Sequence, residues 1–291
     1  MLTPNNKEHF FKYLSLSSLK HVLKGGSLKW SHPSLFNDPF DNQLDFLPIE
    51  DKDLMAEETH NAFMAQLTSD SPVEGYQSNS MSSIIETLRQ IFKTNRVRLN
   101  DDQIAYLKEG ATESVRRAIE GFPKINDAVK KILSDTSIIC VSETHDNLLM
   151  WAHYSENHEG AVIKLLSPTN NSFLRTAQKV VYTEDIPRFT ANDLLSSVSH
   201  EKVLHRLTLT KSTHWEYEKE WRVVSTARNK ATLWEAIPFF ERELGAIYLG
   251  CRMKEETRNE IIELARSRYS HVEIYQAQKH DTKFALTFNK I

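Results

Sequence analysis

The order of apolar and polar residues predicts a strand, a helix and a strand near the N-terminus. The apolar run FFKYLSL is followed by apolar residues at helical spacing, and Gly25-Gly26 ends that helix because glycine adopts the left-handed cap conformation freely. The segment SLKWS then alternates as a strand does, with Leu28 and Trp30 on one face. The next residues, HPSLFNDPFDNQ, are rich in Pro, Asn and Asp, which indicates an ordered loop.

The remaining chain falls into a helical block and a strand-rich block. Residues 50–134 are polar, with helical patterns at about 51–66, 81–93, 101–120 and 124–134 and a turn-rich link at 68–83. After residue 136 we expect two helices, at 192–209 and 254–268. We expect strands at 136–142, 160–165, 179–184, 220–225, 246–250, 271–277 and 284–288.

These elements do not alternate regularly between strand and helix, which favours an α+β fold over a doubly wound sheet. We predict a single domain over residues 1–291. Its core spans 10–49 and 135–291, and residues 50–134 form a helical insertion.

Composition excludes several classes of protein. The chain has 291 residues, 40% of them hydrophobic, and a formal net charge of −3, which is typical of a soluble globular protein and not of a basic nucleic-acid platform. Two cysteines, Cys140 and Cys251, exclude a disulfide framework and a multi-cysteine zinc site. The eight glycines form no glycine-rich phosphate loop, and neither a G-x-S-x-G nor an H-E-x-x-H motif occurs. No apolar run suits a membrane span or a signal peptide, so we expect a cytoplasmic protein without membrane contact.

Three polar clusters lie among the predicted strands. The first contains Lys12, Tyr13, Trp30, Ser31 and the FNDPFD run at 36–41. It is either a structured turn, in which Asn and Asp bond their own backbone, or part of a cleft that binds a flat polar ligand. We expect Asn37 and Asp38 to be partly buried and hydrogen-bonded.

The second cluster is NLLMWAHY (147–154), followed by NHEG (157–160). A short helix would place His153 and Tyr154 near its end, with Gly160 opening the turn into a strand. The pair His153 and His158 lacks a third ligand at a recognisable spacing, so we predict no metal site.

The third cluster is WEYEKEWRVV (215–224). Strand alternation places Glu218, Glu220 and Arg222 on one face. One carboxylate of such a pair can bind a substrate hydroxyl while the other orients a nucleophile. The alternative is an exposed strand whose charges pair with Arg222 and Lys219 and contribute little.

In this order the clusters resemble the bacterial family catalogued as domain of unknown function 2971. The resemblance rests on K-Y, L-K-W-S-x-P-x-x-F-N-D-P-F-D, M-W-x-H-Y-x-x-x-H-x-G, Y-E-K-E-W-R and I-Y-L-G, from Lys12 to about Gly250.

The layout also resembles toxin-type ADP-ribosyltransferases, which implies a split mixed sheet and NAD as a substrate. Glu218-Lys219-Glu220 matches their E-x-E pair, so Glu220 would be catalytic and Glu218 would position the acceptor. The departure from the pattern lies in the first strand, where Lys12 or Tyr13 replaces the usual His or Arg.

A carboxylate near the ribose stabilises the oxocarbenium-like state that forms when the nicotinamide–ribose bond breaks. Tyr13, Trp30 and Tyr154 would stack on nicotinamide, Asn37 or Ser31 would bond its amide or the ribose, and Lys12 or Arg222 would offset pyrophosphate charge. We therefore predict Glu220, Glu218 and Tyr154 as catalytic residues. The predicted NAD-binding residues, with no metal, are Lys12, Tyr13, Trp30, Ser31, Asn37, Asp38, His153 and Arg222.

The resemblance implies a bacterial toxin or antiviral defence role, with a nucleic acid or a protein as the acceptor and an antitoxin or defence-system component as a partner. Two alternatives stay open. One is a non-catalytic binding module in which the FNDPFD loop and the WAHY segment form the recognition surface. The other is a metal-independent nuclease built on His153, His158 and Glu220. Under the transferase hypothesis we expect the Glu220 carboxylate to face solvent in the cleft, so that Glu220→Gln leaves stability nearly unchanged.

Overall fold

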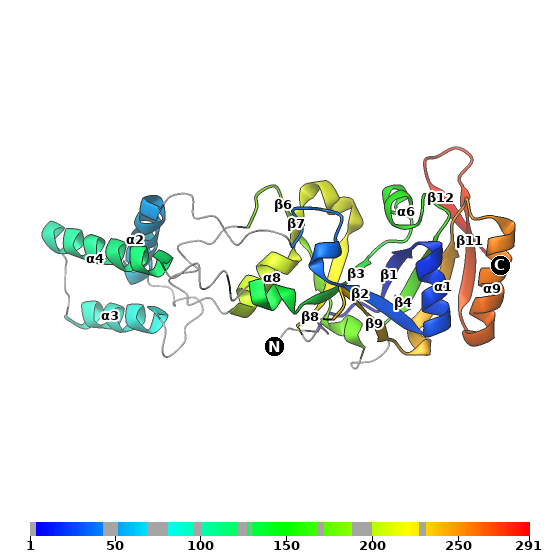
Figure 1. Cartoon of the computed structure of the whole chain (residues 1–291). Helices are drawn as coiled ribbons and strands as arrows, with labels where there is room; N and C mark the ends of the chain where they lie inside the picture. The colour runs from blue at the N-terminus through cyan, green and yellow to red at the C-terminus, as the bar shows by residue number, and fades with distance from the viewer. Residues whose placement is uncertain are drawn as a thin grey trace. The chain divides into compact units, whose positions relative to one another are not determined.

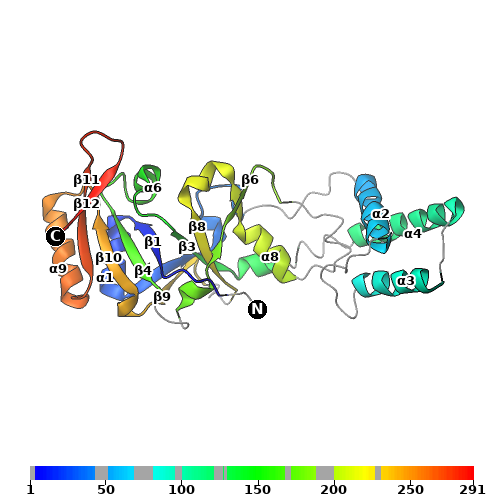
Figure 2. The same cartoon turned by 180° about the vertical axis from the view of Figure 1, so that it is seen from behind.

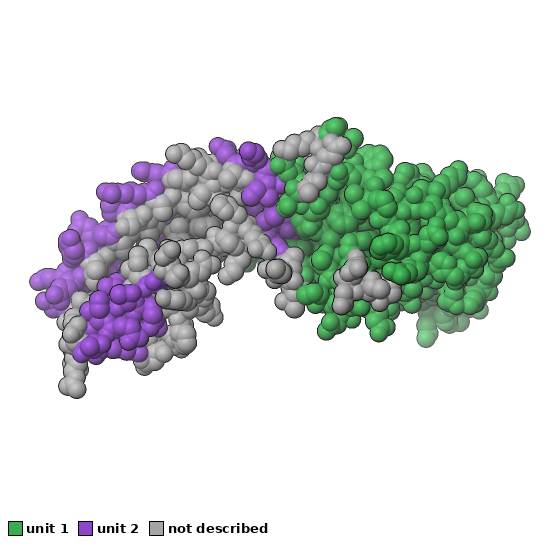
Figure 3. All heavy atoms as spheres, turned by 90° about the horizontal axis from the view of Figure 1, so that it is seen from below, with its two compact units in different colours: residues 1–43, 134–185, 209–291 green, residues 44–133, 186–208 purple. Residues whose placement is uncertain are grey.

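The chain divides into two compact units, coloured in Figure 3. A computed structural model describes residues 4–42, 52–68, 81–95, 100–120, 127, 130–167, 172–187, 200–226 and 231–291. Unit 1 comprises residues 1–43, 134–185 and 209–291, and unit 2 comprises residues 44–133 and 186–208.

Unit 1 contains the strands of the chain's large sheet (Figure 1). Its strands are β1 (His9–Leu14), β2 (Ser27–Ser31), β3 (Ser137–Ser142), β4 (Ala161–Leu166), β5 (Gln178–Lys179), β6 (Val181–Thr183), β7 (Thr210–Ser212), β8 (Glu220–Ser225), β9 (Trp234–Pro238), β10 (Leu244–Leu249), β11 (Glu273–Lys279) and β12 (Leu286–Lys290). Its helices are α1 (Leu16–Gly25), α6 (Leu148–Tyr154), α9 (Glu255–Arg268) and the 3₁₀ turns η1 (Pro33–Leu35), η2 (Phe173–Thr176), η3 (Thr213–Glu218) and η4 (Glu241–Glu243).

In the described residues the large sheet runs β12-β11-β10-β4-β1-β3-β2-β9, and β8 and β5 branch from β3. The β10–β11 pair is parallel and the other pairs of this sheet are antiparallel. The α+β class and the predicted strands are confirmed, with boundaries shifted by a few residues, whereas β7 and β9 were not predicted. The predicted strand at 179–184 forms two short strands with different partners, because β5 pairs with β8 whereas β6 pairs with β7 in a separate two-stranded sheet.

Strand β1 is buried on both faces, which explains its nearly continuous apolar sequence. Phe10 and Leu14 join the core that α1 and α9 cover. Phe11 and Tyr13 join a second cluster with Met150 and Trp151 of α6. An ion pair between Lys20 of α1 and Glu260 of α9 (2.8 Å) joins these two helices. Figure 2 shows the sheet from behind.

The sheet opens where β1 and β3 part. Strand β3 pairs with β8 from Ser137↔Ser225 to Ser142↔Glu220, whereas it meets β1 at the single register Phe11↔Ser142. The strands therefore diverge beside Lys12. Side chains from both of them line the space between.

The loop after α6 holds an unusual backbone. Glu156, Asn157 and His158 have φ values of 51°, 54° and 69°, a left-handed conformation that costs non-glycine residues of order 1–3 kcal/mol each. The Glu156 carboxylate accepts a hydrogen bond from the Leu16 N–H at the start of α1 (2.9 Å). The Gly160 N–H donates to the Ser155 carbonyl (2.8 Å), so this loop holds α6 against the end of β1.

Unit 2 is helical in its described part, as predicted for most of it. Its helices are α2 (Lys52–Thr68), α3 (Met81–Asn95), α4 (Asp101–Glu120) and most of α8 (His200–Leu209). Arg116 of α4 pairs with Asp53 of α2 (2.7 Å). Most of the predicted link at 68–83, part of the helix predicted at 124–134 and residues 192–199 lie outside the described residues.

Gly160→Ala should destabilise unit 1 by at least about 2 kcal/mol. A Cβ at this position would lie 2.2 Å from the Leu14 carbonyl oxygen, and overpacking of a rigid site costs roughly 1–3 kcal/mol or more. The control is Gly110→Ala inside α4, where an added methyl group meets nothing within 4 Å and alanine favours the helix by about 1 kcal/mol. Urea unfolding of the two variants measures the contrast, and equal midpoints would contradict the close packing of the loop.

Candidate functional site

A cavity of about 360 Å³ opens in unit 1 where β1 and β3 diverge. Its walls come from β1, β3, α6, the FNDPFD loop and the start of β8. Of the predicted site residues it gathers Lys12, Tyr13, Asn37, His153, Tyr154, Glu218 and Glu220. The clusters that lie far apart in sequence therefore meet at one site.

The two glutamates reach this cavity from a sharp turn. Glu218 ends η3 and does not lie on a strand, and Lys219 follows in the left-handed conformation (φ 45°) before β8 begins at Glu220. The Ser142 hydroxyl donates to the Glu218 carbonyl (2.6 Å), and the Glu220 N–H donates to the Tyr182 hydroxyl (2.8 Å). These bonds hold the turn so that both carboxylates contact the ammonium of Lys211.

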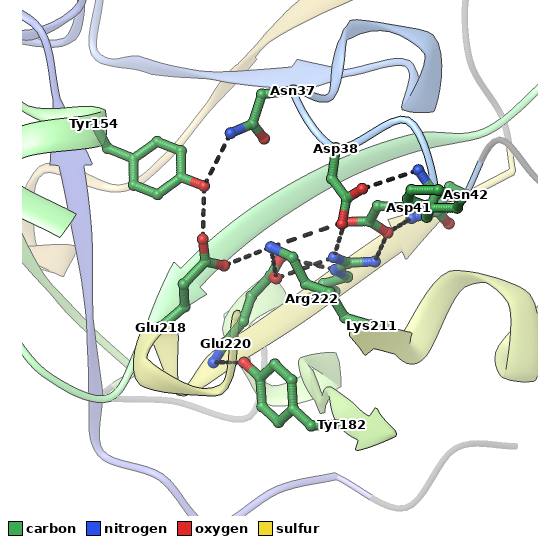
Figure 4. Close-up of polar contacts among 11 residues, drawn as sticks. Asn37, Asp38, Asp41, Asn42, Tyr154, Tyr182, Lys211, Glu218, Glu220 and Arg222 are labelled. Atoms are coloured by element: carbon green, nitrogen blue, oxygen red, sulfur yellow. Dashed lines mark hydrogen bonds and ion pairs between the residues drawn. The ribbon is translucent and has the colours of Figure 1, made fainter. Parts of the chain in front are cut away.

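Figure 4 shows Lys211 and Arg222 among three carboxylates. Lys211 Nζ lies 2.5 Å from Glu218 and 3.0 Å from Glu220. Arg222 donates from Nε to Glu220 (2.7 Å) and binds both oxygens of Asp41, at 2.8 and 2.6 Å. None of these five residues is more than 6% exposed. We call them the ion network. Its three carboxylates and two cations carry a formal net charge of −1.

The ion network shifts the two glutamates in opposite directions. Burial and then the negative charge of Glu220 raise the pKa of Glu218 above its ordinary value. Burial opposes ionisation of Glu220 too, but Arg222 and Lys211 together lower the pKa of Glu220. Burial alone would lower the pKa of Lys211, yet the charges of Glu220 and Glu218 raise it. The site therefore holds one carboxylate firmly ionised beside a more basic one.

Tyr154 connects Glu218 to the loop. Its hydroxyl donates to Glu218 Oε1 (2.6 Å) and accepts from the Asn37 amide (3.4 Å). Burial, followed by the charge of Glu218, raises the pKa of Tyr154. Asn147, the N-cap of α6, donates to the Tyr217 carbonyl (3.2 Å), which fixes the start of this helix beside η3.

Lys12 supplies a cation outside the ion network. Its Nζ donates to the Cys140 carbonyl (2.9 Å), and burial lowers its pKa. Among the described residues its ammonium forms no ion pair with a carboxylate. Lys12 therefore keeps donors available to an anionic group in the cavity.

A second cavity of about 350 Å³ adjoins the first, because Lys12, Tyr13, His153 and Tyr154 line both. Ser31 lies in this second cavity, together with Lys29, His21 and Trp234. Cavities of this size class accommodate small organic ligands.

Two expectations about burial were wrong. The Glu220 carboxylate does not face solvent, because Arg222 and Lys211 enclose it and the residue is 4% exposed. Asn37 is exposed, although its amide is hydrogen-bonded to the Tyr154 hydroxyl as expected. Asp38 is buried and accepts from the Phe40 N–H (2.9 Å), which confirms its bonded turn.

Three of the residues predicted to bind NAD line neither cavity. Trp30 is 5% exposed and packs in the core against Phe173. Asp38 bonds its own loop. Arg222 is 1% exposed and neutralises Glu220 and Asp41 from behind the cavity wall.

Sequence reasoning missed three contributors to the site. Asp41 lies in the FNDPFD run but was not predicted as a site residue. Lys211 and Tyr182 lie in unremarkable polar stretches, TKS and VYT. Their importance arises from long-range contacts with the Glu218–Glu220 turn, and no local pattern signals them.

His158 lies away from this site. It lines a third cavity with Arg252 and Lys279, whereas His153 and Glu220 line the first. The three groups of the nuclease hypothesis are thus divided between two cavities.

A family model described as protein of unknown function (DUF2971) matches residues 150–223. The match runs from α6 to β8 and includes Tyr154, Lys211 and the Glu218–Arg222 segment. It supports the resemblance to that family over this quarter of the chain. No curated protein and no solved structure matches the chain.

Two features are absent from the described residues. None of the helices there is long and apolar enough to cross a membrane. No group of three or more His, Cys, Asp or Glu side chains in that part of the chain is arranged to hold a metal ion. At the ion network, the space among the carboxylates is taken by Lys211 and Arg222.

Glu220→Gln should destabilise unit 1 by about 3 kcal/mol, because loss of one partner leaves buried cations without compensation. Glu216→Gln is the matched control: it lies in the same segment but is exposed, so its effect should stay within about 0.5 kcal/mol. Chemical unfolding at neutral pH measures both. Equal stability of the two variants would show that the ion network does not hold β8 in place.

The stability advantage of the unmodified protein over Glu220→Gln should shrink in acid. The folded state lowers the pKa of Glu220, so below about pH 4.3, the ordinary pKa of a glutamate, the unfolded chain binds a proton that the folded chain excludes. The stabilisation is therefore present above that pH and is lost as the pH falls toward the folded pKa. Urea midpoints of both proteins between pH 6 and pH 3 measure this, and a constant difference would contradict it.

Proposed function

We propose that unit 1 is an ADP-ribosyltransferase-like domain that cleaves NAD and transfers ADP-ribose to a macromolecule. The observation that carries this proposal is the pair Glu218 and Glu220, two carboxylates with opposite pKa shifts at one cavity. Environments that separate the pKa values of neighbouring acids are typical of paired catalytic roles. The branching of the sheet at β3 is compatible with the split mixed sheet of that class.

Each carboxylate has a role in the proposed step. The bond between the nicotinamide nitrogen and ribose C1′ breaks, and its electron pair leaves with neutral nicotinamide. Ionised Glu220 stabilises the positive charge that develops on the ribose. The acceptor oxygen or nitrogen then bonds to C1′. Its proton passes to Glu218, whose raised pKa suits a general base.

The other cavity residues would position NAD. Lys12, whose ammonium forms no ion pair with a carboxylate of the described residues, offsets the pyrophosphate charge. Tyr154 orients Glu218 through its 2.6 Å hydrogen bond. The adjoining cavity, with Ser31 and Trp234, offers room for the rest of the dinucleotide.

A second candidate, a non-catalytic binding module, is favoured by one observation. Both oxygens of Glu220 are already engaged, Oε1 by Arg222 and Oε2 by Arg222 and Lys211. A carboxylate so enclosed can serve the architecture of a ligand site without taking part in a reaction.

The biological setting follows from the resemblance alone. We propose a bacterial toxin or antiviral defence component with an antitoxin or another defence protein as its partner.

Glu218→Gln should reduce transfer of ADP-ribose to the acceptor about 10²–10³-fold, the usual effect of removing one well-placed catalytic group. The assay follows labelled NAD in cell extract on separate protein and RNA gels, which measures transfer and identifies the acceptor, while nicotinamide release measures the cleavage step. Tyr154→Phe removes only the hydroxyl that orients Glu218 and should give a smaller loss of turnover. Glu216→Gln is the control with unchanged turnover, and circular dichroism verifies folding of each variant.

Two outcomes would redirect the assignment. Binding of NAD by calorimetry without nicotinamide release or labelling would favour the binding module. Full activity of folded Glu218→Gln would remove this residue from the mechanism.

A further inference from the structure

A third cavity, of about 480 Å³, lies at the loop between β11 and β12. The loop, residues 280–285, forms one wall, and Leu148, His158 and Arg252 form part of the rest. Figure 1 shows this loop projecting beyond the sheet. Leu148 begins α6, whose other end carries His153 and Tyr154 of the candidate site, so the two sites share one helix.

The charge of this cavity differs from that of the chain as a whole. Arg252, Lys279 and Lys283 line it beside a single carboxylate, Asp281. In the described part of the chain none of these three cations forms an ion pair. The chain carries a net charge of −3, so the cavity is a local basic patch on an acidic protein.

The loop presents an aromatic ring on an ordered backbone. Phe284 is fully exposed, although Leu286 two residues later is half-buried. The His280 N–H donates to the Ala285 carbonyl (3.0 Å), and the Thr282 N–H donates to His280 Nδ1 (3.1 Å). The register Lys279↔Leu286 closes the hairpin beneath. The structured loop thus presents the Phe284 ring to solvent, where it is available to a ligand.

His158 adds a polar group to the cavity wall. Its ring stacks on Trp151 at an interplanar angle of 10°, and its buried Nδ1 has no hydrogen-bond partner among the described residues. Arg252 is held next to it, because the Arg252 N–H donates to the His158 carbonyl (3.0 Å).

We propose that this cavity binds single-stranded nucleic acid. Unpaired cations neutralise successive phosphates, while an exposed aromatic ring stacks on a base without regard to sequence. Carboxylate-rich peptides would bind the cations but would leave Phe284 in water. The exposed aromatic ring therefore favours nucleic acid over an acidic peptide as the ligand. The binding stands independently of the proposed function. Only the additional inference that the bound strand is the ADP-ribose acceptor rests on the proposed function.

The test is fluorescence anisotropy of labelled single-stranded RNA and DNA oligonucleotides with the full chain, without NAD. Phe284→Ala should weaken binding roughly 5- to 150-fold, the effect of losing one stacked base. Lys283→Glu should weaken it and lower the slope of log affinity against log salt by about 0.7 for a lost phosphate contact. Lys24→Glu is the matched control, with the same change of charge at an exposed lysine of α1 that does not line the cavity.

The outcomes separate this inference from the proposed function. Failure of the unmodified chain to bind either oligonucleotide, or equal losses for Lys283→Glu and Lys24→Glu, would overturn the nucleic-acid site. If Phe284→Ala leaves the affinity unchanged while polyglutamate competes with RNA, the cavity binds acidic protein segments instead. None of these measurements involves NAD, so a failed transferase assay leaves their interpretation intact.

Discussion

The buried contact of Arg222 and Lys211 with three carboxylates is the constraint on which this part of unit 1 depends. It joins the loop at Asp41, the strand β7 at Lys211 and the turn at Glu218 and Glu220. These segments are not continuous in the sequence. Each charged side chain would be costly to bury alone, because an unpaired charge loses its hydration. In the folded chain the opposite charges of the ion network compensate one another. The geometry of the cavity wall follows from that mutual neutralisation.

The same contact also sets the chemistry available at the cavity. It holds Glu220 ionised and leaves Glu218 more basic, with Tyr154 bonded to the latter. The enclosure that separates the two acids also occupies the oxygens of Glu220, so stability and reactivity compete at this residue. The loop at 156–158 has a related function. Its strained left-handed backbone positions α6, and therefore Tyr154, beside the turn.

Local patterns in the sequence predicted the elements well. The cap at Gly26 (φ 63°), the alternation of Leu28 and Trp30 and the apolar runs of β3 and β4 depend on interactions within a few residues. The resemblance to ADP-ribosyltransferases, in contrast, placed Trp30 and Arg222 at the ligand and Glu220 in solvent. A strand has two faces, and alternation distinguishes the faces without saying which of them the tertiary structure covers.

The sequence by itself determined the α+β class and most helices and strands, and it marked the WAHY and E-x-E segments as candidate site residues. Only the tertiary structure decided that Lys211, Asp41 and Tyr182 complete that site, that Glu220 is enclosed and that Lys12 keeps donors for a ligand. Elements form through contacts between near neighbours along the chain. The protonation and exposure of a charged group depend instead on which distant charges the fold brings within about 3 Å of it.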